Sequence, residues 1–263
     1  VAVDWASQRA LTGGSDRVLL LWDLAAGEPL RRLVGHSDCV RCVEADWGSG
    51  RVLSGSFDGS ILLWDLGRSC PQKTLKGHSR WVCCLAADWA AGRAVSGGLD
   101  RSLRLWDLAS GEGLRELRGH ADAVWCVALD WASRRALSGG GDGSVRLWDL
   151  AADTCSRELA GHSDSVRCLA LDASTQRALS GSFDGTLRLW DLSARDGAEQ
   201  RRCLTGHVKG VSCLAANWAS GRALSGGGDG SLLLWDLEDA DGDGGPELVL
   251  RAHKGAVLCL AMR

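Results

Sequence analysis

The sequence predicts an all-β fold built from six copies of one short unit. The tryptophans of its Trp-Asp pairs recur at steps of 42, 42, 42, 42 and 45 residues: Trp22, Trp64, Trp106, Trp148, Trp190 and Trp235. The six histidines recur at steps of 42, 42, 42, 45 and 46 residues. The composition is skewed in the same direction, with 35 Gly and 13 Trp but no Tyr and two Phe. Such a bias together with a fixed period indicates duplication of one structural unit.

The second copy shows how each element of the unit is predicted. The apolar run around Val40 and Val43 predicts a buried first strand, and a turn rich in Gly and Asp follows it. The second strand ends in a tight turn at Asp58-Gly59, and the third alternates apolar and polar residues. The predicted strands of this copy are 40–43, 51–56, 60–66 and 73–75. A single four-stranded unit cannot bury both of its faces, so the units are expected to stack on one another around an axis.

Gly-His near the start and Trp-Asp near the end of each unit carry a family resemblance. On these motifs, repeated every 40–45 residues, the chain resembles the WD40-repeat family over essentially all of its 263 residues. The resemblance implies a β-propeller whose units are four-stranded antiparallel blades. We therefore expect an all-β propeller of six blades.

The blade boundaries follow from the alignment of the copies. Blade 1 is expected to combine residues 1–34 with an inner strand from residues 255–263. The other blades are expected at 35–76, 77–118, 119–160, 161–205 and 206–251. However, Val1 and Leu260 claim the same strand position. We therefore expect an excerpt of a longer array, for example seven-bladed or with several propellers, and six closed blades are the alternative.

Charge and hydropathy disfavour two classes of partner. The net charge is −3 and the pI is near 6.1, so there is no general attraction for nucleic acid or anionic membrane. No apolar run approaches the length of a membrane span, and no signal peptide is visible. We expect the domain to be monomeric, without cofactor, and to bind other proteins or peptides.

His, Ser and Asp recur together, which raises the question of a Ser-His-Asp nucleophile. The alternative, which matches the WD40 pattern, is a hydrogen-bonded tetrad of Trp, Ser, His and Asp in each blade. Copy number favours the tetrad, because a stabilising group is needed once per blade and a catalytic site only once. The predicted tetrads are His36, Ser54, Asp58, Trp64; His78, Ser96, Asp100, Trp106; His120, Ser138, Asp142, Trp148; His162, Ser180, Asp184, Trp190; and His207, Ser225, Asp229, Trp235. No catalytic residue is predicted, and the chain is not expected to be an enzyme.

The cysteines and one acidic loop were considered as metal ligands. Six of the 11 Cys stand six residues after a His: Cys42, Cys84, Cys126, Cys168, Cys213 and Cys259. One apolar thiol per blade fits packing between blades better than a disulfide framework, and no Cys-x-x-Cys pair repeats with zinc-ligand spacing. Asp239, Asp241, Asp243 and Gly244 resemble the start of a calcium loop, but Leu250 stands where its Glu is required. No metal site is predicted, and free thiols indicate a reducing compartment, cytoplasm or nucleus.

The residues that differ between copies are the candidates for binding. In the family, the surface formed by the Gly-His loops and the Asp turns, here called the top face, is a docking surface. Carried over by position, the candidates are Phe57, Trp81, Leu99, Phe183, Cys39, Arg17, Arg41, Arg101 and Arg167. The exposed apolar residues predict a docking site, because aromatic anchors dominate many interfaces. The alternative is that these side chains cover neighbouring loops.

The arginines of this set suggest a second function. Their positions resemble those of phosphopeptide-reading propellers in ubiquitin-ligase adaptors, and Arg binds phosphate through two parallel hydrogen bonds. Against this, Asp38, Asp122 and Asp164 stand close enough in sequence to pair with them. We therefore predict a protein-interaction scaffold, with phosphopeptide recognition as the first alternative and an enzyme as the second.

Overall fold

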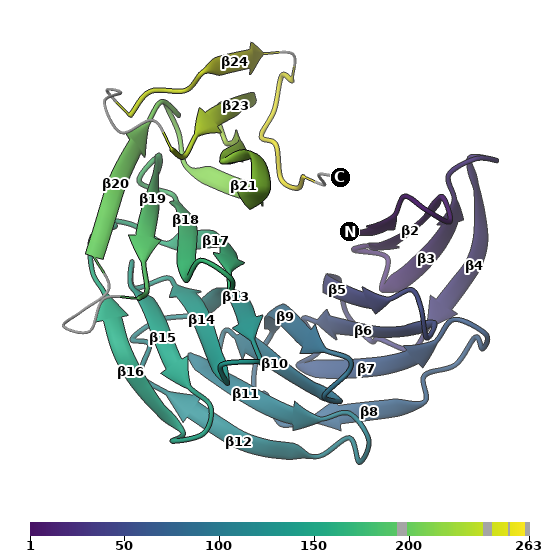
Figure 1. Cartoon of the computed structure of the whole chain (residues 1–263). Coiled ribbons are helices and arrows are strands. Elements are labelled where there is room, and N and C mark those ends of the chain that lie inside the picture. The colour runs from purple at the N-terminus through teal and green to yellow at the C-terminus, as the bar shows by residue number, and fades with distance from the viewer. Residues whose placement is uncertain (194–198, 239–243, 252, 261–263) are drawn as a thin grey trace. The chain divides into compact units, whose positions relative to one another are not determined.

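A computed structural model describes residues 1–193, 199–238, 244–251 and 253–260. The regular secondary structure is almost entirely β-strand, and the strands form six four-stranded antiparallel sheets (Figure 1). Two compact units are present, Val1–Trp131 and Ala132–Met262. Within the described residues, the only helix is the short 3-10 turn η1, Trp218–Ser220. The predicted all-β class and the six four-stranded sheets are therefore confirmed.

The first unit contains three complete sheets and one further strand. The sheets run in the orders β1-β2-β3-β4, β5-β6-β7-β8 and β12-β11-β10-β9. Their strands are β1 Ala2–Asp4, β2 Arg9–Gly13, β3 Val18–Asp23, β4 Glu28–Val34, β5 Val40–Asp46, β6 Arg51–Ser56, β7 Ser60–Asp65, β8 Lys73–Lys76, β9 Val82–Asp88, β10 Arg93–Gly98, β11 Ser102–Asp107 and β12 Gly113–Arg118. Strand β13, Val124–Asp130, follows.

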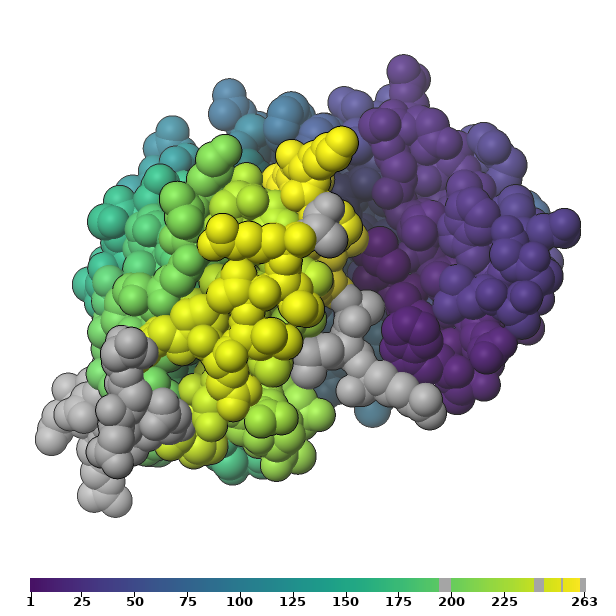
Figure 2. Space-filling view, turned by 90° about the horizontal axis from the view of Figure 1, so that it is seen from above, coloured from purple at the N-terminus to yellow at the C-terminus, as the bar shows by residue number. Residues whose placement is uncertain are grey.

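The second unit repeats the same order. Strands β14 to β16 belong to the sheet β13-β14-β15-β16, and two complete sheets follow, β17-β18-β19-β20 and β21-β22-β23-β24. Their strands are β14 Arg135–Gly140, β15 Val145–Asp149, β16 Thr154–Leu159, β17 Val166–Asp172, β18 Arg177–Ser182, β19 Thr186–Asp191, β20 Glu199–Thr205, β21 Val211–Asn217, β22 Arg222–Gly227, β23 Ser231–Asp236 and β24 Leu248–Arg251. Strand β24 lies in the yellow part of the chain in Figure 2 and has four exposed residues.

The core lies between neighbouring sheets of each unit. In the first unit, Leu53 of β6 is fully buried and packs with Val82 of β9 and Trp106 of β11. In the second unit, Leu179 of β18 packs in the same way with Val211 and Trp235. Each middle strand is thus buried on both faces, which explains why these strands read as apolar runs ending in glycine.

Close packing of first strands requires glycine in the second strands. A Cβ at Gly55 would lie 2.6 Å from Val82 Cγ1 and 2.7 Å from Cys42 Sγ. At Gly181, the corresponding distances are 2.8 Å to Val211 Cγ1 and 2.7 Å to Cys168 Sγ. The periodic cysteine therefore fills the space beside the glycine of its own sheet, where the valine of the next sheet also enters.

The two chain ends were predicted to share the first blade. The structure places β1 in the first position of its sheet, where Val3 pairs with Ala10. Residues 255–260 are in no strand, and 261–263 lie outside the described residues. The contribution of 255–263 to the first blade, like the other blade boundaries, stays a prediction.

Candidate functional site

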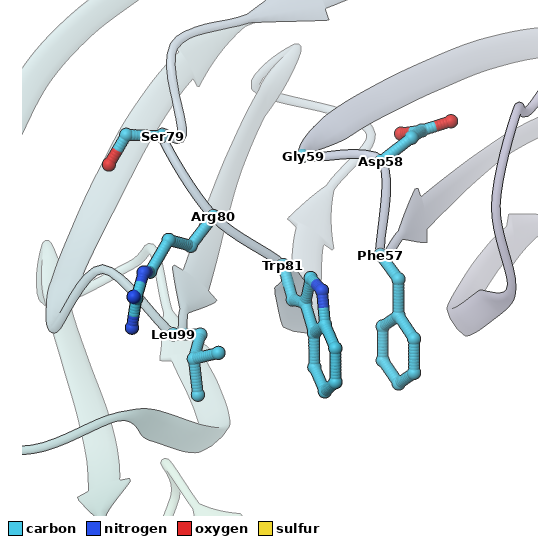
Figure 3. Close-up of a pocket in the computed structure, with 7 residues that line it drawn as sticks. All are labelled: Phe57, Asp58, Gly59, Ser79, Arg80, Trp81 and Leu99. Atoms are coloured by element: carbon cyan, nitrogen blue, oxygen red, sulfur yellow. The ribbon is translucent and has the colours of Figure 1, made fainter.

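A hollow of about 400 Å³ opens at the top face of the first unit. It is lined by Phe57, Asp58, Gly59, Ser79, Arg80, Trp81 and Leu99. The rings of Phe57 and Trp81 are stacked, with centroids 3.9 Å apart and planes 11° apart (Figure 3). Trp81 is 40% exposed, whereas Phe57 and Leu99 are half-buried. The structure thus brings together three of the predicted apolar residues, Phe57, Trp81 and Leu99.

Backbone hydrogen bonds position these side chains. The Phe57 N–H donates to the Cys39 carbonyl at 3.0 Å, and the Leu99 N–H donates to the Trp81 carbonyl at 2.9 Å. The turn after Phe57 is tight, since Gly59 has φ 79° and a Cβ there would lie 3.2 Å from the Arg80 carbonyl oxygen. The loop that carries Arg80 and Trp81 therefore packs directly on the turn that carries Phe57.

Asp58, in the wall of the hollow, connects the surface to the interior. Its carboxylate accepts hydrogen bonds from Ser60, from the Ser37 N–H at 2.9 Å and from His36 Nδ1 at 3.0 Å. Burial raises the pKa of this carboxyl, but the hydrogen bonds outweigh burial and lower the pKa to about 2. Asp58 is therefore ionised at neutral pH, and its acceptor positions are largely used within the protein.

The other side of the His36 ring continues into the core. His36 Nδ1 must carry a proton to bind a carboxylate, so Nε2 accepts from the Ser54 hydroxyl at 2.7 Å. The Ser54 oxygen in turn accepts from the Trp64 indole N–H at 2.8 Å. Ser54 and Trp64 are 0% exposed. This hydroxyl is out of reach of a substrate, so the geometry gives it no use as a nucleophile.

The same chain of hydrogen bonds recurs in three further sheets. The Ser Oγ–His Nε2 and His Nδ1–Asp distances are 2.6 and 2.9 Å for His78, 2.7 and 2.8 Å for His162, and 2.7 and 3.1 Å for His207. Their serines are Ser96, Ser180 and Ser225; their aspartates are Asp100, Asp184 and Asp229. Trp106, Trp190 and Trp235 donate to these serines at 2.8 Å. Burial lowers the pKa of His162, although Asp184 opposes it, so the neutral ring is favoured.

The remaining two copies repeat the indole contact of this pattern. Trp148 donates to Ser138 at 2.7 Å, and His120 is 6% exposed, as His36 is; Asp142 accepts from the Ser144 hydroxyl. The first copy has Thr12 in place of the serine, and Trp22 donates to it at 2.8 Å. Residues 1–34 contain no histidine.

Phe183 of the second unit has a different environment from Phe57. Its ring is 42% exposed and lies against Gly210, where a Cβ would come within 2.6 Å of Phe183 Cδ1. The Arg167 guanidinium lies over the ring, 4.5 Å from its centroid. This is a cation–π contact, so at least one predicted phosphate-binding arginine packs on an apolar neighbour.

The remaining predicted residues lie apart from the hollow's lining. Arg41 and Arg167 occupy β-bulges, since their neighbours pair across the sheet and they do not. Arg17 and Arg101 are exposed and have φ of 70° and 67°. Cys39 is half-buried.

Asp38 and Asp164 accept from the N–H of the following residue, Cys39 at 2.7 Å and Ser165 at 2.6 Å. Asp122 does the same with Ala123 at 2.7 Å.

A cluster of metal-binding side chains is absent from the part of the chain that the structure describes. No group of three or more His, Cys, Asp or Glu is arranged there to hold an ion. The calcium-like string falls mostly outside the described residues, because 239–243 are not among them. All 11 cysteines lie within the described residues, and none of them forms a disulfide. In the same described residues, no helix is long and apolar enough to cross a membrane.

Two residues of interest were missed from the sequence. Arg80 lines the hollow but was not selected, because a charged residue in a loop is usually solvated. Glu44 stands where Ala2, Ala86, Ala128, Ala170 and Ala215 occupy the other copies. Burial raises the pKa of Glu44 to about 7. The break in an otherwise uniform alanine position was the signal that could have identified it.

Stacked four-stranded antiparallel sheets, four of them with the same hydrogen-bonded Trp, Ser, His and Asp, define a repeat protein of the β-propeller class. Five segments match the family described as WD domain, G-beta repeat: residues 27–65, 69–107, 111–149, 153–191 and 198–236. The chain therefore belongs to the WD40 family. Each matched segment begins near the fourth strand of one sheet and ends with the third strand of the next. A search of curated proteins finds no match to the chain.

Proposed function

We propose that this protein is a non-catalytic interaction module that holds a partner protein at the hollow of Phe57, Trp81 and Leu99. WD40 repeats indicate a protein-interaction scaffold in general. The observation that supports this particular site is the stacked Phe57–Trp81 pair, which presents a large, partly exposed apolar surface beside Arg80. A rigid aromatic pair loses little conformational entropy on binding, and such residues dominate protein interfaces.

The chemistry of the hollow limits the partner. Two aromatic rings and Leu99 offer contact to an apolar side chain, and Arg80 offers charge-assisted hydrogen bonds to an acidic neighbour. Asp58 offers less, because its oxygens already accept from Ser60, Ser37 and His36. The proposed ligand is therefore a protein segment with an exposed apolar anchor.

The test uses selection from a random heptapeptide display library on the purified chain. Trp81→Ala is expected to weaken at least one class of recovered peptide by about thirtyfold, as for removal of an aromatic hot spot. Phe183→Ala is the matched control, because Phe183 fills the same position in a nearly identical copy but does not line this hollow. Equal affinity for wild type and Trp81→Ala would contradict the proposal.

The predicted alternative, phosphopeptide recognition by Arg17, Arg41, Arg101 and Arg167, gains less support. Arg167 packs on Phe183, and Arg80 is the arginine that lines the hollow. A phosphorylated copy of each selected peptide separates the two functions. Phosphate-dependent binding that survives Trp81→Ala would favour the alternative.

A further inference from the structure

A second hollow opens in the first unit at the opposite end of the sheets from the Asp turns. It has a volume of about 420 Å³ and is lined by Arg9, Leu21, Leu30, Arg31, Leu66 and Gly67. Arg9 begins β2, Leu30 and Arg31 lie in β4, and Leu66 directly follows β7. This crevice therefore lies between the first and second sheets, away from the Phe57–Trp81 hollow.

The crevice combines positive charge with an apolar floor. Leu21 is buried, whereas Leu30 is 50% exposed. In the described part of the chain, the side chains of Arg9 and Arg31 make no hydrogen bond or ion pair, although the charge of Arg9 acts on Asp4. None of the lining residues is acidic. Asp4 and Asp23 flank Arg9 in the sheet, but within the described residues no carboxylate lies within ion-pair distance of either guanidinium group.

The second unit contains the corresponding crevice, about 320 Å³ in volume. Arg177 begins β18 as Arg9 begins β2. Arg202 pairs with Leu189 of the third strand as Arg31 pairs with Leu21. Glu238 is the second residue after the Asp of its Trp-Asp pair, which is the position of Gly67 in the second copy.

In the second unit, the corresponding position supplies the missing carboxylate. Glu238 Oε1 accepts a hydrogen bond from Arg177 Nη1 at 2.5 Å. Arg202 donates to the Asp236 carbonyl oxygen at 3.0 Å. The molecule therefore shows which group fits beside the arginine that begins the second strand. Gly67 has no side chain to offer in the first unit.

At the corresponding place between the second and third sheets, the cations are engaged within the protein. Arg51 donates to Ser49 and to the Trp89 carbonyl oxygen, and it forms an ion pair with Asp46. Lys73 donates to the Ala109 carbonyl oxygen. The Arg9–Arg31 crevice differs from both of these equivalent places, because within the described residues its guanidinium groups make no hydrogen bond.

We propose that the Arg9–Arg31 crevice binds an acidic segment of a partner protein. A carboxylate of that segment pairs with Arg9 and Arg31, in the place that Glu238 takes beside Arg177. An adjacent apolar side chain packs on Leu21, Leu30 and Leu66. Charge-assisted pairs of this kind combine affinity with geometric selection. This binding is separate from docking at the Phe57–Trp81 hollow and does not depend on it.

The decisive variant is Gly67→Glu, which supplies the carboxylate from within the chain. A Cβ at Gly67 meets only Asp65, with its Oδ1 at 3.0 Å, and no positive φ stands in the way. Gly67→Ala is the matched control, since Ala25, Ala109 and Ala151 occupy this position in other copies. A double variant, Arg9→Gln with Arg31→Gln, removes the charges from exposed or half-buried positions.

The probe is the same random heptapeptide display library, and affinities of recovered peptides are measured by fluorescence anisotropy. Wild type and Gly67→Ala are expected to recover peptides with an acidic residue next to an apolar one. Gly67→Glu and the double arginine variant are expected to bind those peptides roughly tenfold more weakly or worse, and added salt to weaken wild-type binding. Trp81→Ala is expected to leave these peptides unaffected.

Two results would overturn the proposal. One is that no acidic–apolar peptide is enriched on the wild-type chain. The other is that every enriched acidic–apolar peptide binds Gly67→Glu and wild type equally. Peptides whose binding is weakened only by Trp81→Ala bind at the Phe57–Trp81 hollow. The two proposals are therefore tested independently. Circular dichroism of each variant confirms that it is folded.

Discussion

The second and fifth copies of the repeat have nearly the same sequence but present different surfaces. Residues 53–66 and 179–192 differ at three positions, Ser60/Thr186, Ile61/Leu187 and Leu62/Arg188. Their internal hydrogen bonds match within 0.2 Å, from tryptophan to aspartate. Yet Phe57 stacks on Trp81, whereas Phe183 lies on Gly210 beneath Arg167. The internal hydrogen bonds are therefore determined by residues of the same copy. What the phenylalanine contacts is determined by one residue of the next copy, Trp81 or Gly210.

The largest expected effect tests the part that the two copies share. Ser54→Ala and Ser180→Ala each leave a buried indole N–H and a buried imidazole nitrogen without a partner. Each substitution should lower the free energy of unfolding by about 3 kcal/mol, because each unpaired buried group costs about 1–3 kcal/mol. Chemical denaturation followed by circular dichroism measures this loss. Markedly unequal losses at the two positions would show that the shared hydrogen bonds do not have the same energetic weight.

A smaller effect is expected where the copies differ inside, at Glu44 and its counterpart Ala170. Burial raises the pKa of Glu44 from 4.5 to about 7. The folded state therefore holds this proton more tightly, and stability falls as pH rises through that window. Glu44→Ala should remove this slope and stabilise the protein above pH 7 by roughly 2 kcal/mol, which is less than the full shift of the pKa implies because Glu44 is only half-buried.

Denaturation curves collected across this pH range test the Glu44 prediction. Glu44→Gln is the control, because it keeps the size of the side chain and removes the titration. A stability profile for Glu44→Gln that runs parallel to wild type would exclude Glu44 as the source of the slope.

The smallest expected effect concerns the surface contact of the fifth copy. A Cβ at Gly210 would lie 2.6 Å from Phe183 Cδ1 and 2.8 Å from its Cα. Gly210→Ala should therefore displace the ring and destabilise the protein by about 1 kcal/mol, as for modest overpacking. Gly228→Ala is the control, since its Cβ meets Lys209 at an ordinary 3.4 Å. The midpoints of thermal unfolding are measured for both variants. Equal midpoints would show that the Phe183 ring moves aside without loss of stability.

The regular part of the molecule could be predicted because every copy repeats the same constraints. The second strand predicted at 51–56 is β6, and the strands predicted at 60–66 and 73–75 differ from β7 and β8 by one residue at their ends. The repeat period and the turn residues are local signals, so both can be recognised from the sequence alone.

The site was only partly predictable, because it depends on contacts between copies. Phe57, Trp81 and Leu99 were selected singly as breaks in the repeat, but their meeting at one hollow required the packing of one sheet on the next. Arg9 and Arg31 gave no signal, since an arginine on a strand is usually solvated. They stand out only because Gly67 has no carboxylate where Glu238 has one in the corresponding crevice. This difference becomes visible only when the copies are compared.

The periodic cysteines provide a chemical means of detecting when an interface between copies opens. Burial raises the pKa of Cys42 to about 12 and that of Cys213 to about 11, so few thiolates form in the folded state. Each of these thiols sits where a valine from the following part of the chain, Val82 or Val257, closes over a glycine. Alkylation of such a thiol therefore waits until that valine has moved away. The order in which the cysteines react would map, sheet by sheet, which part of the array loosens first.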